Sequence, residues 1–276
     1  MPKPNYIRLS AQDNIQILYE DRSILAIDKP PTWMLVPLSW QKTNRNLQAA
    51  LLSSIAAGDF WAKSRNLKFL KYIHRLDAET SGVMLFAKSQ GALRSFEDMF
   101  ETRKMEKVYL AVTDRVPKEA KWNCRLCLAP DPNEIGRMIV DAKTGKTAET
   151  DFRLIASVNG KHLIEARPYS GRTHQIRVHL AESGYPIVGD DLYGAPAKQG
   201  MGLRAVGLAY RDPFTRKPVR IFAGLEQFLK RFGFAPNAYR VTFQSVNSPE
   251  SQPATNQNRR KFEQKDAKVT KEGDAS

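Results

Sequence analysis

The stretch YIHRLDAETSGVMLFAK, residues 72–88, joins a charged cluster to an apolar run through a turn of small residues. The cluster is HRLD (74–77), the turn is TSG (80–82) and the apolar run is VMLFA (83–87). A short apolar run bounded by turn residues is typical of a buried strand. Asp77 would then lie on the loop that enters this strand, and loops on a rigid scaffold are where catalytic groups concentrate. The alternative is a solvated Arg–Asp pair in an ordinary turn, which would contribute little.

The chain is strongly basic, with 43 Lys and Arg against 29 Asp and Glu, a net charge of +14 and a pI near 9.8. Such an excess of positive charge attracts polyanions, of which nucleic acid is the most common. Residues 247–276 carry six basic and five acidic side chains, so nearly all of the net charge lies on the preceding chain. This distribution favours a nucleic-acid-binding surface on the folded part over a merely basic tail.

The only two cysteines, Cys124 and Cys127, form a single CxxC. A structural zinc site needs four ligands, and no second pair of cysteines exists to complete one. A redox role stays open, although the alternating polarity of NCRLCL favours an ordinary strand. So few cysteines suit a reducing compartment. Neither a signal peptide nor a run of about 20 apolar residues is present, and we expect a soluble, cytoplasmic protein without membrane partners.

The pattern of apolar residues and turn signals predicts many strands joined by hairpins, with a few helices between them. The fold class is therefore α+β, with a mixed, largely antiparallel sheet and flanking helices. We expect a flexible arm over residues 1–14, one folded domain over 15–246 and a disordered tail over 247–276, which is too polar to support a core. The predicted strands are 15–20, 24–29, 83–87, 107–114, 203–210 and 218–223, with a hairpin over 146–168; the predicted helices are 43–57, 89–104, 174–184 and 225–234.

A second polar cluster lies in GRTHQIRVHL, residues 171–180, at the start of a predicted helix. Arg172, His174, Gln175 and Arg177 could bind phosphate there, because a helix N-terminus and guanidinium groups both favour anions. His174 and His179 are five residues apart, whereas four would place them side by side for a metal. The alternative is a helix with a solvated basic face.

The two clusters together resemble the signatures of the RluA-type pseudouridine synthases. HRLDAETSG (74–82) matches one signature and GRTHQIRVHL (171–180) the second, followed by VGDDLYG (188–194). Three weaker matches lie in collinear order with them: ILYEDRSILAIDKP, KVYLAV and GRMIVDAKTGKTAETDF. The resemblance runs from about residue 15 to residue 223. It implies the pseudouridine synthase fold with a central catalytic cleft, an RNA substrate, and a reaction that needs neither cofactor nor metal.

The resemblance also implies roles for individual residues. Asp77 would be the catalytic aspartate, Arg177 would pair with it, and Tyr109 would line the pocket and stack on the uracil. Arg75 would help to extrude the target nucleotide, and Leu208 would be an apolar pocket residue. The remaining predicted RNA contacts are His74, Arg172, His174 and Gln175.

The chemistry of the reaction fits these residue types. Turning uridine into pseudouridine breaks a carbon–nitrogen glycosidic bond and forms a carbon–carbon bond in its place. An ionised carboxylate could attack as a nucleophile or remove a ribose proton, and the sequence leaves both routes open. A neighbouring guanidinium would keep that carboxylate ionised, and an aromatic side chain would hold the base once it has left its stack.

Departures from the family pattern leave the substrate open between rRNA and tRNA. Trp33 stands near the position of a usual glycine, and the family's Leu-His-Ala reads here as Leu203-Arg204-Ala205. No segment resembles the S4 RNA-binding domain of many members, and we expect a monomer. Two other functions stay possible: a non-catalytic RNA-binding or ribosome-assembly protein on the same fold, and a hydrolase that uses Asp77 with His74 or His174.

Overall fold

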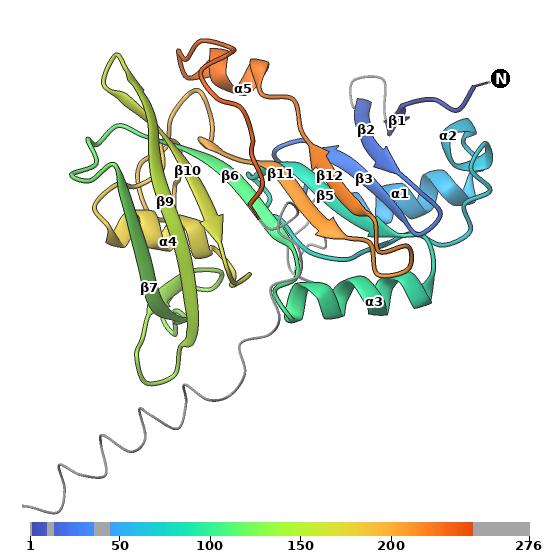
Figure 1. Ribbon diagram of the computed structural model, residues 1–276, viewed down its shortest axis with the longest axis horizontal. Helices are drawn as coiled ribbons and strands as arrows, with labels where there is room; N and C mark the ends of the chain where they lie inside the picture. The colour runs from blue at the N-terminus through green and yellow to red at the C-terminus, as the bar shows by residue number, and fades with distance from the viewer. Residues whose placement is uncertain (1, 10–13, 36–44, 245–276) are drawn as a thin grey trace, which may run out of the picture.

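The computed structural model describes residues 2–9, 14–35 and 45–244, which form one twelve-stranded sheet with helices packed on it (Figure 1). The strands follow the order β1-β2-β3-β5-β11-β6-β10-β9-β7-β8, with β12 beside β11 and β4 beside β5. Every pair is antiparallel except β5 with β11, so the predicted fold class is confirmed. The strands are β1 (Tyr6–Arg8), β2 (Asn14–Glu20), β3 (Ile24–Lys29), β4 (Lys71–Tyr72), β5 (Ser81–Ala87), β6 (Glu106–Thr113), β7 (Lys121–Pro130), β8 (Met138–Val140), β9 (Lys146–Val158), β10 (Lys161–Pro168), β11 (Leu203–Arg211) and β12 (Pro218–Phe222).

Five helices of the described chain cover parts of this sheet. In Figure 1, α3 lies below the half of the sheet that contains β5, and α4 lies behind the other half, against β9 and β10. The central strands β6 and β11 join the two halves. The helices are α1 (Leu47–Ala56), α2 (Phe60–Lys63), α3 (Gln90–Glu101), α4 (Gln175–Glu182) and α5 (Glu226–Arg231).

Local sequence signals account for several element boundaries. Ser89 caps α3, its hydroxyl accepting a hydrogen bond from the Ala92 amide at 3.1 Å, as its position before an apolar-periodic run predicts. Asn159 and Gly160 adopt positive φ values of 49° and 71° between β9 and β10, the geometry expected of an Asn-Gly hairpin turn. The short elements α2, β4 and β8 carry no comparable signal.

The amino-terminal segment is more ordered than the arm expected over residues 1–14. Residues 6–8 form β1, which pairs with β2 through Ile7 and Ile15. Both side chains are buried, because they reach the cluster of Leu25, Ile27 and Trp33. Part of the predicted arm is therefore an edge strand. The predicted tail over 247–276 lies outside the described residues.

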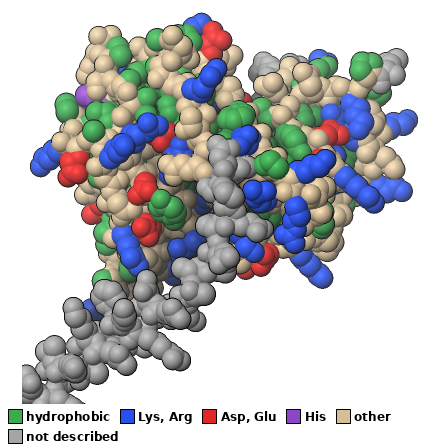
Figure 2. All heavy atoms as spheres, viewed as in Figure 1, with side chains coloured by type: hydrophobic (Ala, Val, Ile, Leu, Met, Phe, Trp, Pro, Cys, Tyr) green, Lys and Arg blue, Asp and Glu red, His purple; other side chains and the backbone are tan. Residues whose placement is uncertain are grey.

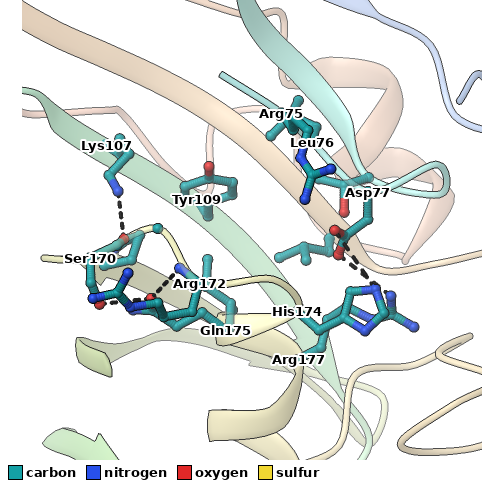
Figure 3. Close-up of a pocket in the computed structure, with 15 residues that line it drawn as sticks. Arg75, Leu76, Asp77, Lys107, Tyr109, Ser170, Arg172, His174, Gln175 and Arg177 are labelled. Atoms are coloured by element: carbon teal, nitrogen blue, oxygen red, sulfur yellow. Dashed lines mark hydrogen bonds and ion pairs between the residues drawn. The ribbon is translucent and has the colours of Figure 1, made fainter. Parts of the chain in front are cut away.

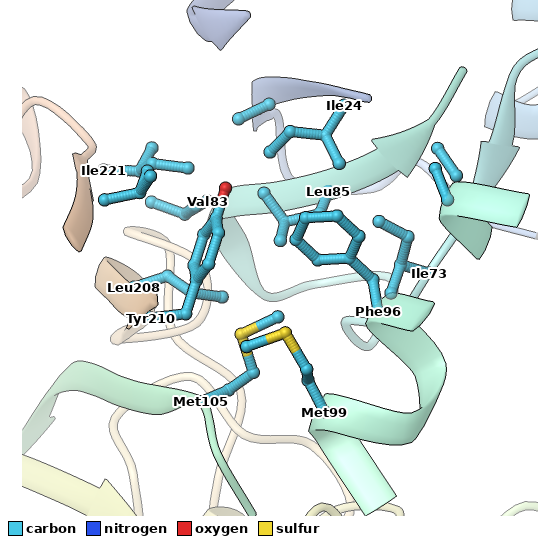
Figure 4. Packing of buried hydrophobic residues seen from close by; sticks show 14 of the residues in the cluster. Ile24, Ile73, Val83, Leu85, Phe96, Met99, Met105, Leu208, Tyr210 and Ile221 are labelled. Atoms are coloured by element: carbon cyan, nitrogen blue, oxygen red, sulfur yellow. The ribbon is translucent and has the colours of Figure 1, made fainter. Parts of the chain in front are cut away.

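The core beneath α3 confirms that residues 83–87 form a buried strand. All seven residues of β5 are buried. Phe96 and Met99 of α3 pack against Val83 and Leu85 of β5, with Tyr210 of β11 on the far side (Figure 4). Each large apolar side chain buried in this way contributes ~1.5–3 kcal/mol relative to exposure. The cluster fixes β5, and with it the end of the loop that carries Asp77.

The TSG turn is shaped by a close approach between β5 and β11. Gly82 has φ 117°, and a Cβ atom there would lie 2.0 Å from the carbonyl oxygen of Ala205. Only glycine allows this contact, because any side chain would collide with backbone. Beside it, Arg204 donates to Ser81 Oγ at 3.1 Å and to Asp28 Oδ2 at 2.6 Å. The arginine that replaces the family's histidine therefore ties β11 to β5 and β3.

Candidate active site

The pocket opens at the middle of the sheet, where two loops meet the central strands (Figure 3). Asp77 comes from the loop before β5, Tyr109 from β6, Leu203 from β11 and Arg177 from α4. The sequence placed Asp77 and Arg177 in separate motifs 100 residues apart. The fold brings them, together with Tyr109, to one cavity.

Arg177 stands between two carboxylates rather than opposite one. Its Nε and Nη2 donate to Asp190 at 2.8 and 2.7 Å, and its Nη1 donates to Asp77 Oδ2 at 3.4 Å. Burial opposes the guanidinium charge, yet the hydrogen bonds to Asp190 and the charge of Asp77 hold the pKa of Arg177 above its ordinary value. Bidentate pairs of this kind fix geometry as well as charge. Asp190 therefore aims the remaining Nη1 of Arg177 at Asp77.

The backbone around Asp190 explains why this carboxylate is so well placed. Gly189 has φ 78°, and a Cβ there would lie 2.2 Å from the carbonyl oxygen of Gly200, so only glycine fits. Asp190 is fully buried and also accepts hydrogen bonds from the amides of Leu192 and Tyr193, at 3.1 and 3.2 Å. Sequence reasoning quoted this Gly-Asp pair as part of a motif but gave Asp190 no role.

His174 faces Asp77 from the other side and is held by Tyr193. The Tyr193 hydroxyl accepts from the Met138 amide at 2.8 Å and lies 2.9 Å from His174 Nδ1. Either atom can be the donor in this hydrogen bond, and the ring turns its other nitrogen, Nε2, toward Asp77. Nε2 lies 3.9 Å from Asp77 Oδ1. Burial is the main cause that lowers the pKa of His174, which favours the neutral ring.

The buried side chain of Lys29 holds the loop that carries Asp77 in place. This lysine is fully buried, and its Nζ donates to the carbonyl oxygens of Pro30, Ala78 and Thr80 at 3.0, 2.8 and 2.9 Å. Burial lowers the pKa of Lys29 to about 8, while the charges of Glu79 and Asp77 act in the opposite direction. The loop is thus preorganised by a buried cation rather than by packing alone.

Tyr109 and Lys107 occupy the β6 side of the pocket (Figure 3). Burial, together with the charge of Asp77, raises the pKa of Tyr109, so its phenol stays protonated. The Lys107 ammonium donates to the carbonyl oxygen of Ser170 at 2.6 Å, and burial followed by the charge of Arg103 lowers its pKa to about 8. Lys107 was in a quoted motif, KVYLAV, but was not singled out.

Two of the predicted RNA contacts, His74 and Gln175, have their side-chain polar atoms bonded within the protein, although Gln175 also lines the pocket. His74 turns away from the pocket: its Nε2 accepts from the Leu85 amide at 3.1 Å, and its ring stacks on Phe100 at 4.7 Å. Burial lowers the pKa of His74 to about 3. Gln175 is buried, and its amide bonds Ser170 Oγ, the Arg172 amide and the Glu149 carbonyl. Both residues shape loops, because their polar atoms are satisfied inside the protein.

The predicted pocket residue Leu208 is wrong, and Leu203 takes its place. Leu203 pairs with Ala111 and lines the pocket, whereas Leu208 pairs with Lys107, farther along β6. A register shift between Ala205 and Gly207 separates the two positions. Leu208 lies in the core beneath α3 (Figure 4). Counting along a strand could not reveal this, because the bulge changes the register.

Arg75 and Arg172 are exposed and line the pocket, as their predicted contacts with RNA require. Their roles remain predictions. Cys124 and Cys127 are free thiols on β7, which agrees with the ordinary strand favoured for them. Within residues 2–9, 14–35 and 45–244, no three His, Cys, Asp or Glu side chains gather as a metal site would require. No helix in these same ranges is long and apolar enough to cross a membrane.

Comparison with known proteins agrees with this arrangement. The family described as RNA pseudouridylate synthase matches residues 25–182. The chain belongs to this family. Its relatives include the ribosomal large subunit pseudouridine synthase C of Vibrio vulnificus, 32% identical over 225 residues, covering 78% of this chain and 67% of the relative. The Escherichia coli protein of the same name is 33% identical over 227 residues, covering 78% and 68%.

Solved structures show the same fold. Human RNA pseudouridylate synthase domain containing 4 superposes with a TM-score of 0.62 at 22% identity, covering 78% of this chain and 90% of the other. Human RNA pseudouridylate synthase domain containing 1 gives 0.61 at 23%, covering 79% and 86%. The chain is thus an RNA pseudouridine synthase of the RluA type, and the expected synthase fold is confirmed.

Proposed function

We propose that this RNA pseudouridine synthase modifies a uridine in large-subunit ribosomal RNA, with Asp77 as the catalytic carboxylate. The observation that carries the proposal is the contact between Asp77 Oδ2 and Arg177 Nη1, 3.4 Å long, inside a pocket walled by Tyr109. The choice of rRNA over tRNA rests on the relatives, whose names specify the large ribosomal subunit.

The surroundings of Asp77 suit a carboxylate that must react while ionised. Arg177 places a positive charge beside one oxygen, and Nε2 of His174 lies 3.9 Å from the other. About a quarter of the Asp77 side chain remains exposed, so the carboxylate is accessible to a nucleotide that enters the pocket. Both routes, attack on the ribose and removal of a ribose proton, need an ionised carboxylate.

The pocket also meets the needs of the base while its glycosidic bond is open. Leu203 and Ile176 give the cavity an apolar part, and Tyr109 supplies an aromatic ring with a protonated hydroxyl. A detached uracil must stay in place while it turns to present its C5 atom to the ribose. Stacking on an aromatic ring retains a flipped base without fixing its rotation in the plane of the ring. Arg75 is exposed and lines the pocket, and we expect it to occupy the gap that the extruded nucleotide leaves.

The substrate is tested with the purified chain and two sets of transcripts, fragments of large-subunit rRNA and a panel of tRNAs. Pseudouridine is mapped by carbodiimide modification and primer extension. We expect new stops in an rRNA fragment only. Stops confined to tRNA would show that the substrate proposal is wrong while leaving the enzyme class intact. No pseudouridine in either set, from protein that is folded and binds RNA, would favour the non-catalytic alternative.

A further inference from the structure

A second cavity adjoins the active-site pocket and has no assigned role. The two cavities share Lys107 and Pro168, so they adjoin where β6 begins and β10 ends. The other side chains that matter here are Arg103, Lys104, Arg167 and Tyr169. Figure 2 shows more Lys and Arg side chains than Asp and Glu on the face of the molecule in view, and the cavity lies just beyond the C-terminal end of α3.

The charges of the second cavity are incompletely balanced. Arg167 is paired, since it donates to Glu106 at 2.5 Å and to Glu165 at 2.8 Å. Arg103 and Lys104 are exposed, and no carboxylate of the described residues lies within 4.0 Å of either cation. Arg103 is also close enough to Lys107 to help lower the pKa of that lysine. Like charges gathered without counter-charges favour an anionic ligand.

The backbone holds Arg103 in a conformation that a non-glycine residue seldom adopts. Its φ is 58°, directly after α3, where a glycine would be less strained. A cation at a helix C-terminus does gain from the helix dipole. The interaction with the helix dipole explains why Arg103 is favourable here, but it does not explain the neighbouring Lys104 and Lys107.

Tyr169 adds an aromatic surface beside these cations. Its side chain is 46% exposed, although its hydroxyl donates to Asp151 Oδ2 at 2.5 Å and its amide bonds the Glu149 carbonyl. The ring is therefore held in place with part of its surface open to solvent. Fixed, exposed aromatic rings next to cations are the usual platform for a base of single-stranded nucleic acid.

We propose that the second cavity binds a nucleotide next to the target uridine, with its phosphate on Arg103 and Lys104 and its base stacked on Tyr169. This inference rests on the proposed function, because it needs a target nucleotide in the first pocket. Lys107 stands at the border between the two nucleotides. The ligand is single-stranded RNA, since a paired base could not reach the ring.

The chain offers a matched control for the two cations. Arg216 and Lys217 also form an exposed Arg-Lys pair whose arginine has a positive φ, 61°, but they lie in the turn between β11 and β12. The test compares R103Q/K104Q with R216Q/K217Q. It measures the Kd for a single-stranded RNA oligonucleotide by fluorescence anisotropy at several salt concentrations. KM, kcat and Tm are measured on the rRNA fragment.

For R103Q/K104Q we expect Kd and KM to rise roughly tenfold and the salt dependence of log Kd to lose about 1.4 units of slope, about 0.7 per cation on a single strand. The kcat and Tm values should stay unchanged, as should every value for R216Q/K217Q. Equal effects in both double variants would overturn the proposal, because they would show that the RNA is attracted by positive charge anywhere on the surface. A lower Tm with an unchanged Kd would also overturn it, because Arg103 and Lys104 would then only stabilise the end of α3.

Tyr169 is tested by a second pair of variants. Y169A should weaken binding by on the order of tenfold, as the loss of one stacked base does, while Y169F should bind as the wild type because it keeps the ring. Equal binding by all three proteins would exclude the stacking platform. A wild-type protein that binds RNA but forms no pseudouridine would contradict the proposed function alone, because the Kd values still test the second cavity.

Discussion

The two adjoining cavities differ in how their cations are balanced. In the first, Arg177 is held between Asp190 and Asp77, so a carboxylate balances its charge on each side. In the second, Arg103 and Lys104 have no carboxylate within ion-pairing distance among the described residues. Balanced charges fix the position of a reacting group, whereas unbalanced ones leave attraction for a ligand. The contrast separates the part of this protein suited to chemistry from the part suited to holding RNA.

The largest expected effect comes from removing the charge of Asp77, the proposed catalytic carboxylate. Asp77→Asn keeps the shape of the side chain but can neither attack nor accept a proton, so pseudouridine formation should fall on the order of 10³-fold or more. RNA affinity should stay within about twofold of wild type, because phosphate contacts supply most of it. Single-turnover assays and anisotropy measure the two quantities. The control Glu79→Gln, two residues away, should remain active; full activity of Asp77→Asn would end the assignment.

The next effect concerns the carboxylate that aims Arg177. Asp190→Asn leaves a buried guanidinium without its charged partner, and such a loss costs ~3–5 kcal/mol of stability. We expect a lower midpoint in urea unfolding and a reduced kcat, because Nη1 of Arg177 is no longer directed at Asp77. Asp191→Asn is the matched control: that side chain is 69% exposed and 3.9 Å from Arg177. Equal unfolding midpoints for the two variants would contradict the role given to Asp190.

A smaller effect should follow from releasing His174. Tyr193→Phe removes one hydrogen bond from the ring and one from the Met138 amide, and each such bond contributes about 0.5–1.5 kcal/mol. We expect kcat to fall roughly three- to tenfold without a change in KM. Tyr185→Phe is the control, because the Tyr185 hydroxyl also accepts from a backbone amide, that of Lys118, at 2.9 Å. If KM rises and kcat stays unchanged, Tyr193 contributes to RNA binding and does not act by positioning His174.

The last prediction concerns stability and not catalysis: a pH dependence that comes from a buried histidine of α4, the helix that carries Arg177. His179 of α4 is fully buried, and burial lowers its pKa to about 4. The unfolded chain therefore binds the extra proton between pH 6.5 and 4, and stability falls with decreasing pH across that window by about 1.4 kcal/mol per unit. The difference between the unfolding midpoints of wild type and His179→Gln should be smaller at pH 5 than at pH 7.5, because only the wild type loses the stability linked to His179. A constant difference would exclude the titration.

The sequence predicted the elements of the fold better than the directions of the side chains. The buried strand, the cap at Ser89 and the Asn-Gly hairpin each depend on residues close together in the chain, so local pattern was enough. Asp77, Tyr109 and Arg177 came from the family resemblance. His74 and Leu208 were placed wrongly because a loop turns the first inward and a bulge shifts the second. Asp190 directly follows the glycine of the quoted VGDDLYG segment, but its pairing with Arg177 could not be read from the sequence, because it depends on how the buried chain is folded.

The position of β11 has a consequence for the order in which the molecule can be made. This strand lies between β5 and β6 in the sheet, although 115 residues separate it from β5 and 89 from β6 in the chain. A nascent polypeptide that already contains Asp77, Tyr109 and Arg177 still lacks β11, the strand that joins the two halves of the sheet. Pairings over such a separation form late and slowly. Catalytic competence would therefore arrive abruptly, once β11 has been made, rather than growing with each motif.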